Sequence, residues 1–345
     1  MKKFLFAILF VLLFTGFIFA QENLEIYFLE VGQGDAVLII ASCGHVILVD
    51  SGPREEVILS HLESLEITRI DLVIASHAHA DHIGGMATII ESYQPYIFLD
   101  PGIQHTTTTY ENLLEVVEEQ GIVYFQAAER SITLCALTFS VLPPADPLIS
   151  RSALNNNSAV VRLDYGDFSV LFTGDIEKER EAQLLQDVPE KLDVLVLKVP
   201  HHGSRSSSTL EFLEAVNPEI AVIPCGKDNR YGHPHEETLN ALESLEIEVY
   251  RTDEYGTILV KTDGNTYEVI PEFRRARSPP EITFLRWFFR VPPPSHPYVG
   301  SRKSAIFHDP HCVHAEMIHP HNLVEFESRE EAVESGRRPC KGCIP

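Results

Sequence analysis

Between Leu24 and about Glu272, short apolar runs alternate with amphipathic stretches of helical period. The runs are rich in Val and Ile and are bounded by Gly, Pro and Asp, which is typical of buried β-strands. We therefore expect a mixed α/β and α+β fold, in which helices cover the outer faces of the sheets. The predicted strands are Glu25–Leu29, Ala36–Ile40, His45–Asp50, Leu72–Ala75, Ser158–Leu163, Ser169–Thr173, Val194–Val199 and Ile220–Pro224. The predicted helices are Glu55–Leu65, Met86–Tyr93, Glu111–Gln120, Lys178–Leu185, Thr209–Val216 and Glu236–Leu245.

The densest group of metal-ligating side chains directly follows the strand predicted to end at Ala75. His77, His79, Asp81 and His82 fall within six residues, and two glycines come next. An extended turn would let His77 and His79 point to the same side, and the next turn would bring Asp81 and His82 to a neighbouring point. Neutral imidazoles and a carboxylate suit zinc, manganese or iron. The pattern predicts a metal site, and a solvated histidine loop is the alternative.

Side chains of the same kind follow three later apolar runs. Asp175 comes after the run that ends at Thr173, and it could bridge two metals. His201 and His202 follow the run that ends at Val199, and His233 lies beyond the run that ends at Pro224. Each group alone is as compatible with a structural role as with a ligand role. Together they repeat one arrangement, in which metal-binding residue types follow buried strands.

Several motifs, taken in order, resemble the metallo-β-lactamase superfamily and in particular the hydrolase domain of the ComEC-type DNA-uptake competence proteins. The resemblance covers residues 24–265. The motifs are Val31-Gly-Gln-Gly-Asp-Ala36, Leu48-Val-Asp-Ser-Gly52, His77-x-His79-x-Asp81-His82, Asn155-Asn-Asn-Ser158, Gly174-Asp175, His201-His-Gly-Ser204, Tyr231-Gly-His-Pro234 and Arg251-Thr-Asp-x-x-Gly256.

The resemblance implies an αββα sandwich with a two-metal site at one edge. It implies that His77 and His79 hold the first metal, that Asp81 and His82 hold the second, and that Asp175 bridges the two. His233 would complete the second site, and Asp50 would orient the ligand loop from behind. Asp81 is also counted as catalytic, together with His201 or His202, which would face the substrate as a proton donor or phosphate contact.

One position departs from many members of the superfamily, which have a further histidine about twenty residues before the bridging aspartate. This chain has Asn155, Asn156 and Asn157 there, as the competence proteins do. An amide oxygen is a harder ligand than an imidazole, so the first site is expected to favour manganese over zinc. Asn155 and Asn156 are therefore expected next to the ligands.

The expected reaction is hydrolysis by two divalent metal ions, zinc or manganese, which activate a water molecule. The competence-like motifs favour a phosphodiester in DNA or a nucleotide. An amide or ester hydrolase of the β-lactamase kind is one alternative, and a DNA-binding or uptake-accessory protein with little catalysis is another.

The formal net charge of the chain is −23. Residues 272–345 contribute +2 and the two N-terminal lysines contribute another +2, so residues 21–271 carry a net charge of −27. Such a domain is unsuited to broad nonspecific binding of nucleic acid, but local recognition stays open because bound divalent metals change the local field.

The N-terminus has the pattern of a secretory signal peptide over residues 1–20. Two lysines precede an apolar run from Phe4 to Phe14, and Ala20 precedes a polar residue. The hydrolase domain would then span 21–272, in a secreted, periplasmic or extracellular protein. An uncleaved N-terminal anchor that holds the protein near a membrane is the alternative, because Ile18 is large for the position three before the cut.

Residues 273–296 are rich in Pro, Arg and aromatic side chains and are predicted to be a linker. In the following unit, 297–345, Ser328 and Glu331 form a capping-box pattern, and Gly336 is expected to end the helix. His308, Cys312, Cys340 and Cys343 could hold a structural zinc, with a disulfide among the cysteines as the alternative. This unit resembles the zinc-binding domain of the Ada DNA-repair proteins.

The hydrolase domain contains three further cysteines, Cys43, Cys135 and Cys225. They lie among apolar neighbours and are predicted to be buried thiols.

Overall fold

The computed structural model describes residues 23–273, 298–302, 304, 306–308 and 323–339. These residues form two compact units, one of residues 23–273 and one that begins at residue 298. The predicted leader lies outside the described residues, as do the linker beyond Phe273 and the three C-terminal cysteines. No helix within the described ranges has the length and apolar character needed to span a membrane.

The first sheet of the larger unit has the order β15-β14-β1-β2-β3-β4-β5-β6. Strands β3 to β6 run parallel, and the remaining neighbours pair antiparallel. On one face, its apolar side chains pack against α1 (Glu55–Ser64), α3 (Met86–Tyr93) and α4 (Thr108–Glu119). The strands are β1 (Leu24–Phe28), β2 (Val37–Ile40), β3 (Val46–Val49), β4 (Leu72–Ile74), β5 (Ile97–Asp100), β6 (Val123–Gln126), β14 (Ile258–Thr262) and β15 (Tyr267–Pro271).

The second sheet has the order β13-β12-β11-β10-β9-β8-β7. Strands β10 to β13 run parallel, and β7 to β10 pair antiparallel. Helices α6 (Lys178–Asp187), α7 (Leu210–Val216) and α8 (Glu236–Ser244) cover its outer face. The strands are β7 (Arg130–Leu134), β8 (Leu137–Leu142), β9 (Val160–Tyr165), β10 (Phe168–Phe172), β11 (Val196–Lys198), β12 (Ile220–Ile223) and β13 (Glu248–Arg251).

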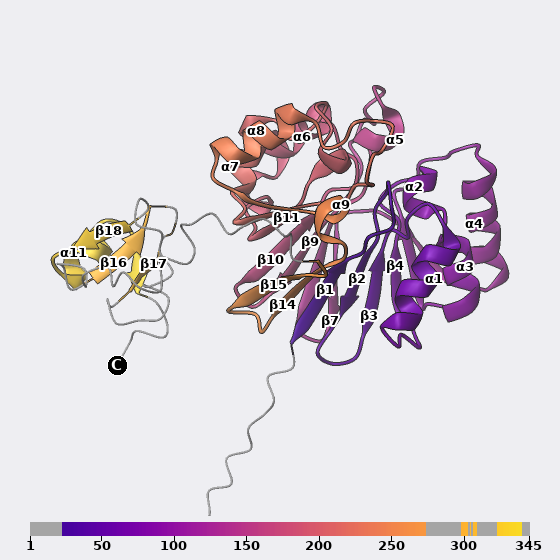
Figure 1. Ribbon diagram of the computed structural model, residues 1–345, viewed down its shortest axis with the longest axis horizontal. Coiled ribbons are helices and arrows are strands. Elements are labelled where there is room, and N and C mark those ends of the chain that lie inside the picture. Colours follow the sequence, from indigo (N-terminus) through magenta and orange to yellow (C-terminus); the bar gives the residue numbers. More distant parts are fainter. Residues whose placement is uncertain (1–22, 274–297, 303, 305, 309–322, 340–345) are drawn as a thin grey trace, which may run out of the picture. The chain divides into compact units, whose positions relative to one another are not determined.

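The two sheets face each other across the main hydrophobic core, and the helices form the two outer layers (Figure 1). Phe28 of β1 and Phe172 of β10 meet in this core, with ring centroids 6.4 Å apart. Both side chains are almost completely buried. The unit is therefore an αββα sandwich, which confirms the expected fold class.

Each strand and helix predicted between Leu24 and Leu245 is present, with ends that differ by up to a few residues. Strands β5 to β8 and β13 to β15 were not among the predictions. In β6 and β7, which are sheet-edge strands, exposed residues interrupt the apolar pattern. A strand with one partner strand and few buried side chains gives a weak sequence signal.

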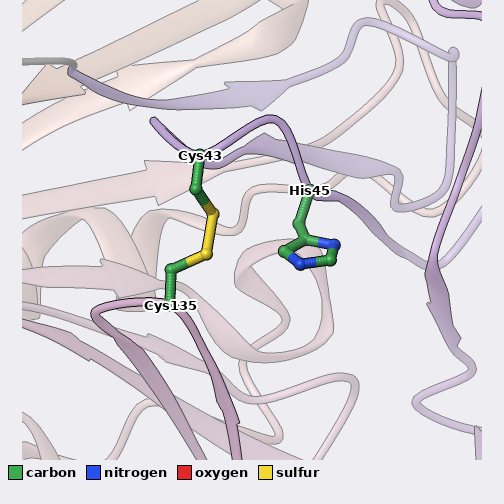
Figure 2. A group of neighbouring side chains, drawn as sticks. All are labelled: Cys43, His45 and Cys135. Atoms are coloured by element: carbon green, nitrogen blue, oxygen red, sulfur yellow. A yellow bond between two sulfur atoms is a disulfide. The ribbon is translucent and has the colours of Figure 1, made fainter.

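The prediction for Cys43 and Cys135 is wrong, because the two residues form a disulfide and are not buried thiols. Cys43 lies in the turn between β2 and β3, and Cys135 lies in the turn between β7 and β8, so the bond joins the two sheets (Figure 2). Both residues are exposed, because a tight hairpin turn places its side chains at the surface even when the flanking strands are apolar. Cys225 is a buried free thiol, as predicted.

The smaller unit contains a sheet of order β18-β16-β17-β19 and helix α11 (Arg329–Glu334). Ser328 Oγ accepts a hydrogen bond from the Glu331 backbone N–H at 3.1 Å, which confirms the predicted cap. Its core is small and centres on Phe307, Phe326 and Ala332. The strands are β16 (Tyr298–Ser301), β17 (Ile306–His308), β18 (Leu323–Phe326) and β19 (Arg338–Pro339).

Candidate metal centre

The carboxyl ends of strands from both sheets place the predicted site residues at one edge of the sandwich. Asp50 directly follows β3, and His77 comes shortly after β4. Asp175 and His202 follow β10 and β11 of the other sheet in the same way. Asp81 and His82 lie on the short helix α2 (Ala80–Ile83). The site is therefore built from loops held by rigid strands, which is where open α/β sheets bind ligands.

Asp175 lies at the centre of the cluster, where a bridging ligand was predicted. Its Oδ2 atom is 3.9 Å from His77 Nε2, 3.3 Å from His82 Nε2 and 3.4 Å from His202 Nε2. All four side chains are buried. Three imidazole nitrogens thus point at one carboxylate oxygen.

Four overlapping sets of possible ligand atoms share this cluster, and two of them contain only residues predicted as ligands or substrate contacts. His77, His82 and Asp175 form the first set, and Asp81, His82 and His202 form the second. Within each set, the ligand atoms lie within 4.8 Å of one another. His79 lies beside the first set, with its Nδ1 atom 2.9 Å from His77 Nε2. The spacing is compatible with two neighbouring cations.

Electrostatics at the cluster favour bound positive charge. Burial lowers the pKa of His77 well below its usual value, so this imidazole is neutral, which is the form that binds a metal. Burial would also lower the pKa of His82 and His202, but the surrounding carboxylates, Asp175 first, raise it well above the usual value for both. A divalent cation would replace those protons and neutralise the same carboxylates.

Several buried atoms in the cluster have no hydrogen-bond partner among the described residues. They include His82 Nε2, His202 Nε2, Asp175 Oδ1 and Asn155 Oδ1. Buried polar atoms are nearly always paired, so unpaired nitrogen and oxygen atoms that face one point indicate a missing ligand. Imidazole nitrogens with carboxylate and amide oxygens are the donor types that zinc and manganese accept. The residues therefore fit the divalent ions that the sequence implied.

Asp50 contacts the loop that carries His77 and His82. Its carboxylate accepts hydrogen bonds from the Ser76 backbone N–H and hydroxyl, both at 2.7 Å. The Nδ1 atom of His82 lies 2.8 Å from the same carboxylate. A proton fixed on Nδ1 leaves the Nε2 lone pair facing Asp175, which is how a carboxylate behind a histidine orients it for a metal.

The structure distinguishes the two consecutive histidines, His201 and His202, by their burial and their neighbours. The sequence alone could not do this. His202 is 2% exposed and lies among Asp35, Asp81 and Asp175, whereas His201 is 20% exposed at the rim of the site. His201 Nε2 lies 3.4 Å from Asn155 Nδ2. The ring of His233 is 6.1 Å from that of His202 and 5.5 Å from that of His201, so it lies beside the second ligand set.

The two asparagines have different roles. Asn155, on α5 (Ala153–Asn156), lies beside the site through its Nδ2 atom, which is 3.4 Å from His201 Nε2, and its buried Oδ1 atom has no hydrogen-bond partner among the described residues. Asn156 points elsewhere, because its Oδ1 accepts a hydrogen bond from the Glu177 backbone N–H at 2.9 Å and its Nδ2 donates to Arg151 O at 2.9 Å. It thereby fixes the loop that carries Asp175.

Two buried charged residues of the site were missing from the predicted set. Lys198 donates to the Gly174 carbonyl at 2.7 Å, contacts Asp35 and lies 3.8 Å from Asp175 Oδ1. Asp35 in turn lies 3.1 Å from His202 Nδ1. A lysine within the apolar run that forms β11 was the available signal, since an unpaired charge is almost never buried.

The loop before Asp35 reaches the cluster through a close backbone contact. The Asp35 N–H donates to the Asp81 carbonyl at 3.1 Å. Gly34 has a φ of +149° and lies against that carbonyl, where a Cβ atom would clash. Only glycine permits this approach.

Only one of the four predicted zinc ligands of the smaller unit lies within the described residues. It is His308, the last residue of β17. Cys312, Cys340 and Cys343 lie outside the described residues.

The fold and the site are those of a metal-dependent hydrolase of the αββα class. The sequence model described as the Metallo-beta-lactamase superfamily matches residues 29–227, and this chain belongs to that superfamily. ComE operon protein 3 of Bacillus subtilis is 32% identical over 273 residues, which cover 72% of this chain and 34% of the relative. Recombination protein 2 of Haemophilus influenzae is 32% identical over 290 residues, 81% of this chain and 33% of the relative. This chain thus spans about a third of the length of these curated relatives.

Among solved structures, the metallo-beta-lactamase fold protein YhfI from Bacillus subtilis is similar, with a TM-score of 0.47 and 15% sequence identity. The match covers 70% of this chain and all of that one.

Proposed function

We propose that this chain is an exported, metal-dependent phosphodiesterase that hydrolyses DNA or nucleotides. The observation that carries the proposal is the convergence of three buried imidazoles, those of His77, His82 and His202, on Asp175. Two divalent ions bound there would supply an activated water and neutralise the charge of a reacting phosphate. His77, His79, Asn155 and Asp175 would hold the first ion. Asp81, His82, His202 and the shared Asp175 would hold the second, with His233 next to it.

The other residues of the site would orient the ligating histidines or contact the substrate. Asp50 keeps a proton on His82 Nδ1, and the Lys198 ammonium neutralises Asp35 behind His202. His201 lies at the rim, where burial lowers its pKa, so its imidazole is neutral at pH 7. A neutral imidazole can donate one hydrogen bond to a phosphate oxygen without repelling the metals. We assign this substrate contact to His201 because His202 is enclosed by carboxylates.

The phosphodiester substrate is supported by the names of the matched relatives, a competence-operon protein and a recombination protein. An Asn155 oxygen among the first-site ligands would suit the harder manganese ion better than zinc. The alternatives are an amide or ester hydrolase of the β-lactamase kind, and a DNA-binding or uptake-accessory protein with little catalysis.

Export is supported by the leader-like N-terminus and by the Cys43–Cys135 disulfide, since such bonds persist in oxidising compartments. An N-terminal membrane anchor would satisfy the same observations.

For residues 297–345 we propose one structural zinc, held by His308, Cys312, Cys340 and Cys343. Native mass spectrometry of that fragment would contradict it by showing a Cys340–Cys343 disulfide and no metal.

The deciding experiment compares four substrates with manganese and with zinc. Single-stranded DNA, duplex DNA and bis(p-nitrophenyl) phosphate report phosphodiester cleavage, and nitrocefin reports β-lactam cleavage. We expect turnover of the phosphodiesters, faster with manganese than with zinc. Fast nitrocefin cleavage without phosphodiester turnover would favour the amide hydrolase, and binding of DNA without turnover would favour the accessory protein.

A further inference from the structure

An arginine and an aromatic ring extend from the metal cluster to the surface. Tyr231 lies on the loop between β12 and α8, and its side chain is 48% exposed. Its ring stacks on that of His233, with centroids 5.6 Å apart and an interplanar angle of 22°. The guanidinium of Arg230 lies over the Tyr231 ring, 4.8 Å from its centroid, and donates to the tyrosine oxygen at 2.6 Å. Because His233 lies beside His201 and His202, this column of stacked groups begins at the proposed site.

The loop holds the column in place before any ligand arrives. Asn229 Oδ1 accepts hydrogen bonds from the backbone N–H groups of Tyr231 and His233, at 3.2 and 3.0 Å. Its Nδ2 donates to the Gly226 carbonyl at 2.9 Å. An exposed aromatic ring that is fixed in this way loses little conformational freedom when a ligand stacks on it.

The charge of Arg230 is available to a ligand. Among the residues that the structure describes, Arg230 forms no ion pair, although the domain is strongly acidic. The Tyr231 hydroxyl and, more weakly, the Asp81 carboxylate raise the pKa of the guanidinium. Arg230 is placed near the proposed site by its stacking on Tyr231, whose ring stacks on that of His233.

We propose that Arg230, Tyr231 and His233 form a nucleobase-stacking subsite for single-stranded polynucleotides, which delivers the adjoining phosphodiester to the metal cluster. This inference rests on the proposed function and narrows its substrate class. Stacking on aromatic rings and guanidinium planes is how proteins bind single strands without reading their sequence. The bases of a duplex are already stacked on one another, so a duplex cannot use the subsite unless it opens.

The test compares two labelled strands of equal length and charge, oligo(dT) and an oligomer of abasic tetrahydrofuran residues. Binding to the full chain is measured by fluorescence anisotropy with a chelator present, so that no cleavage intervenes. We expect wild-type protein to bind the base-containing strand about tenfold more tightly. Tyr231→Ala should reduce this ratio to near one, and Tyr231→Phe should preserve it. Tyr96→Ala, which removes an exposed tyrosine next to β5, is the control and should leave the ratio unchanged.

Arg230→Gln removes the positive charge and the guanidinium plane together. It should weaken the binding of both strands, lower the salt dependence of binding by about the equivalent of one phosphate contact, and also lower the ratio between the two strands, because a guanidinium plane stacks on bases. A wild-type ratio near one, or a ratio that survives Tyr231→Ala, would overturn the subsite. Cleavage is then assayed with manganese, and a base-dependent ratio without cleavage of either strand would reject the hydrolase proposal while leaving the subsite in place.

Discussion

The Nδ1 atom of His202 lies 3.0 Å from the Pro224 carbonyl oxygen and 3.1 Å from an Asp35 carboxylate oxygen, while its Nε2 atom lies near Asp81 and Asp175. Asp35 also contacts the buried Lys198. A carboxylate behind a ligating histidine fixes which nitrogen carries the proton and makes the other a better donor.

Asp35→Asn should therefore weaken divalent metal binding by about 10- to 100-fold, the usual loss when such a partner is removed. Chelator competition monitored by metal content measures this affinity. Asp164→Asn is a matched control, since Asp164 pairs with Arg162 on β9 and contacts no proposed ligand. Equal metal affinity in the Asp35 variant and the wild type would contradict a positioning role for Asp35.

The proposed ligands themselves give a stronger test. His77→Ala and Asp175→Ala should each remove most of the bound metal and abolish hydrolysis, because Asp175 contacts all three converging imidazoles. Elemental analysis and phosphodiester turnover are the measurements, and circular dichroism reports whether the fold persists. His61→Ala is the control, because His61 lies on α1 and its side chain hydrogen-bonds the carbonyl of Glu30. Wild-type turnover in either ligand variant would refute the assignment of the site.

The Cys43–Cys135 bond should contribute substantially to stability. It closes a loop with a sequence separation of 92 residues. Constraining the unfolded chain over such a length stabilises a protein by about 4.6 kcal/mol in the chain-entropy model. For a domain of this size that corresponds to roughly 10 °C in melting temperature.

Calorimetry of the wild type and of the double variant Cys43→Ser, Cys135→Ser measures this difference. A reducing agent should lower the melting temperature of the wild type toward that of the variant, and should affect the variant much less. Identical melting temperatures for the oxidised wild type and the double variant would show that the bond does not stabilise the fold.

Glu181 should make the stability of the fold depend on pH. Burial raises the pKa of its carboxyl to about 7, although the backbone N–H groups of Thr209 and Ser208 donate to it. Between pH 4.5 and 7 the unfolded chain has released this proton and the folded chain still holds it. Stability therefore falls as pH rises through this window, by about 3 kcal/mol in total.

Glu181→Gln removes that titration. The free energy of unfolding of the wild type, relative to that of the variant, should decline between pH 4.5 and 8 and change little above pH 8. Urea denaturation across this range measures the difference. A difference that is constant with pH would show that Glu181 has an ordinary pKa in the folded protein.

Predictions from sequence were most reliable where the evidence was local. The strands β3, β4, β10 and β11 are buried along their whole length, so their sequences are almost entirely apolar, with Ser169 and Lys198 as the exceptions, and each predicted strand is present. His77, His79, Asp81 and His82 lie close together because they follow a single strand on one short turn. Edge strands such as β6 escaped prediction, since half-exposed strands lack a continuous apolar run.

The sequence by itself determined which residue types end each buried strand, and hence that a metal cluster could form at the edge of a sheet. Only the tertiary structure decided how the two sheets face each other. That packing brings Asp35 from the first sheet against Lys198 and His202 from the second, distinguishes His202 from His201, and pairs Cys43 with Cys135. These contacts join residues that are distant along the chain, and they form because burial of both sheets' apolar faces in one core fixes the relative position of the loops.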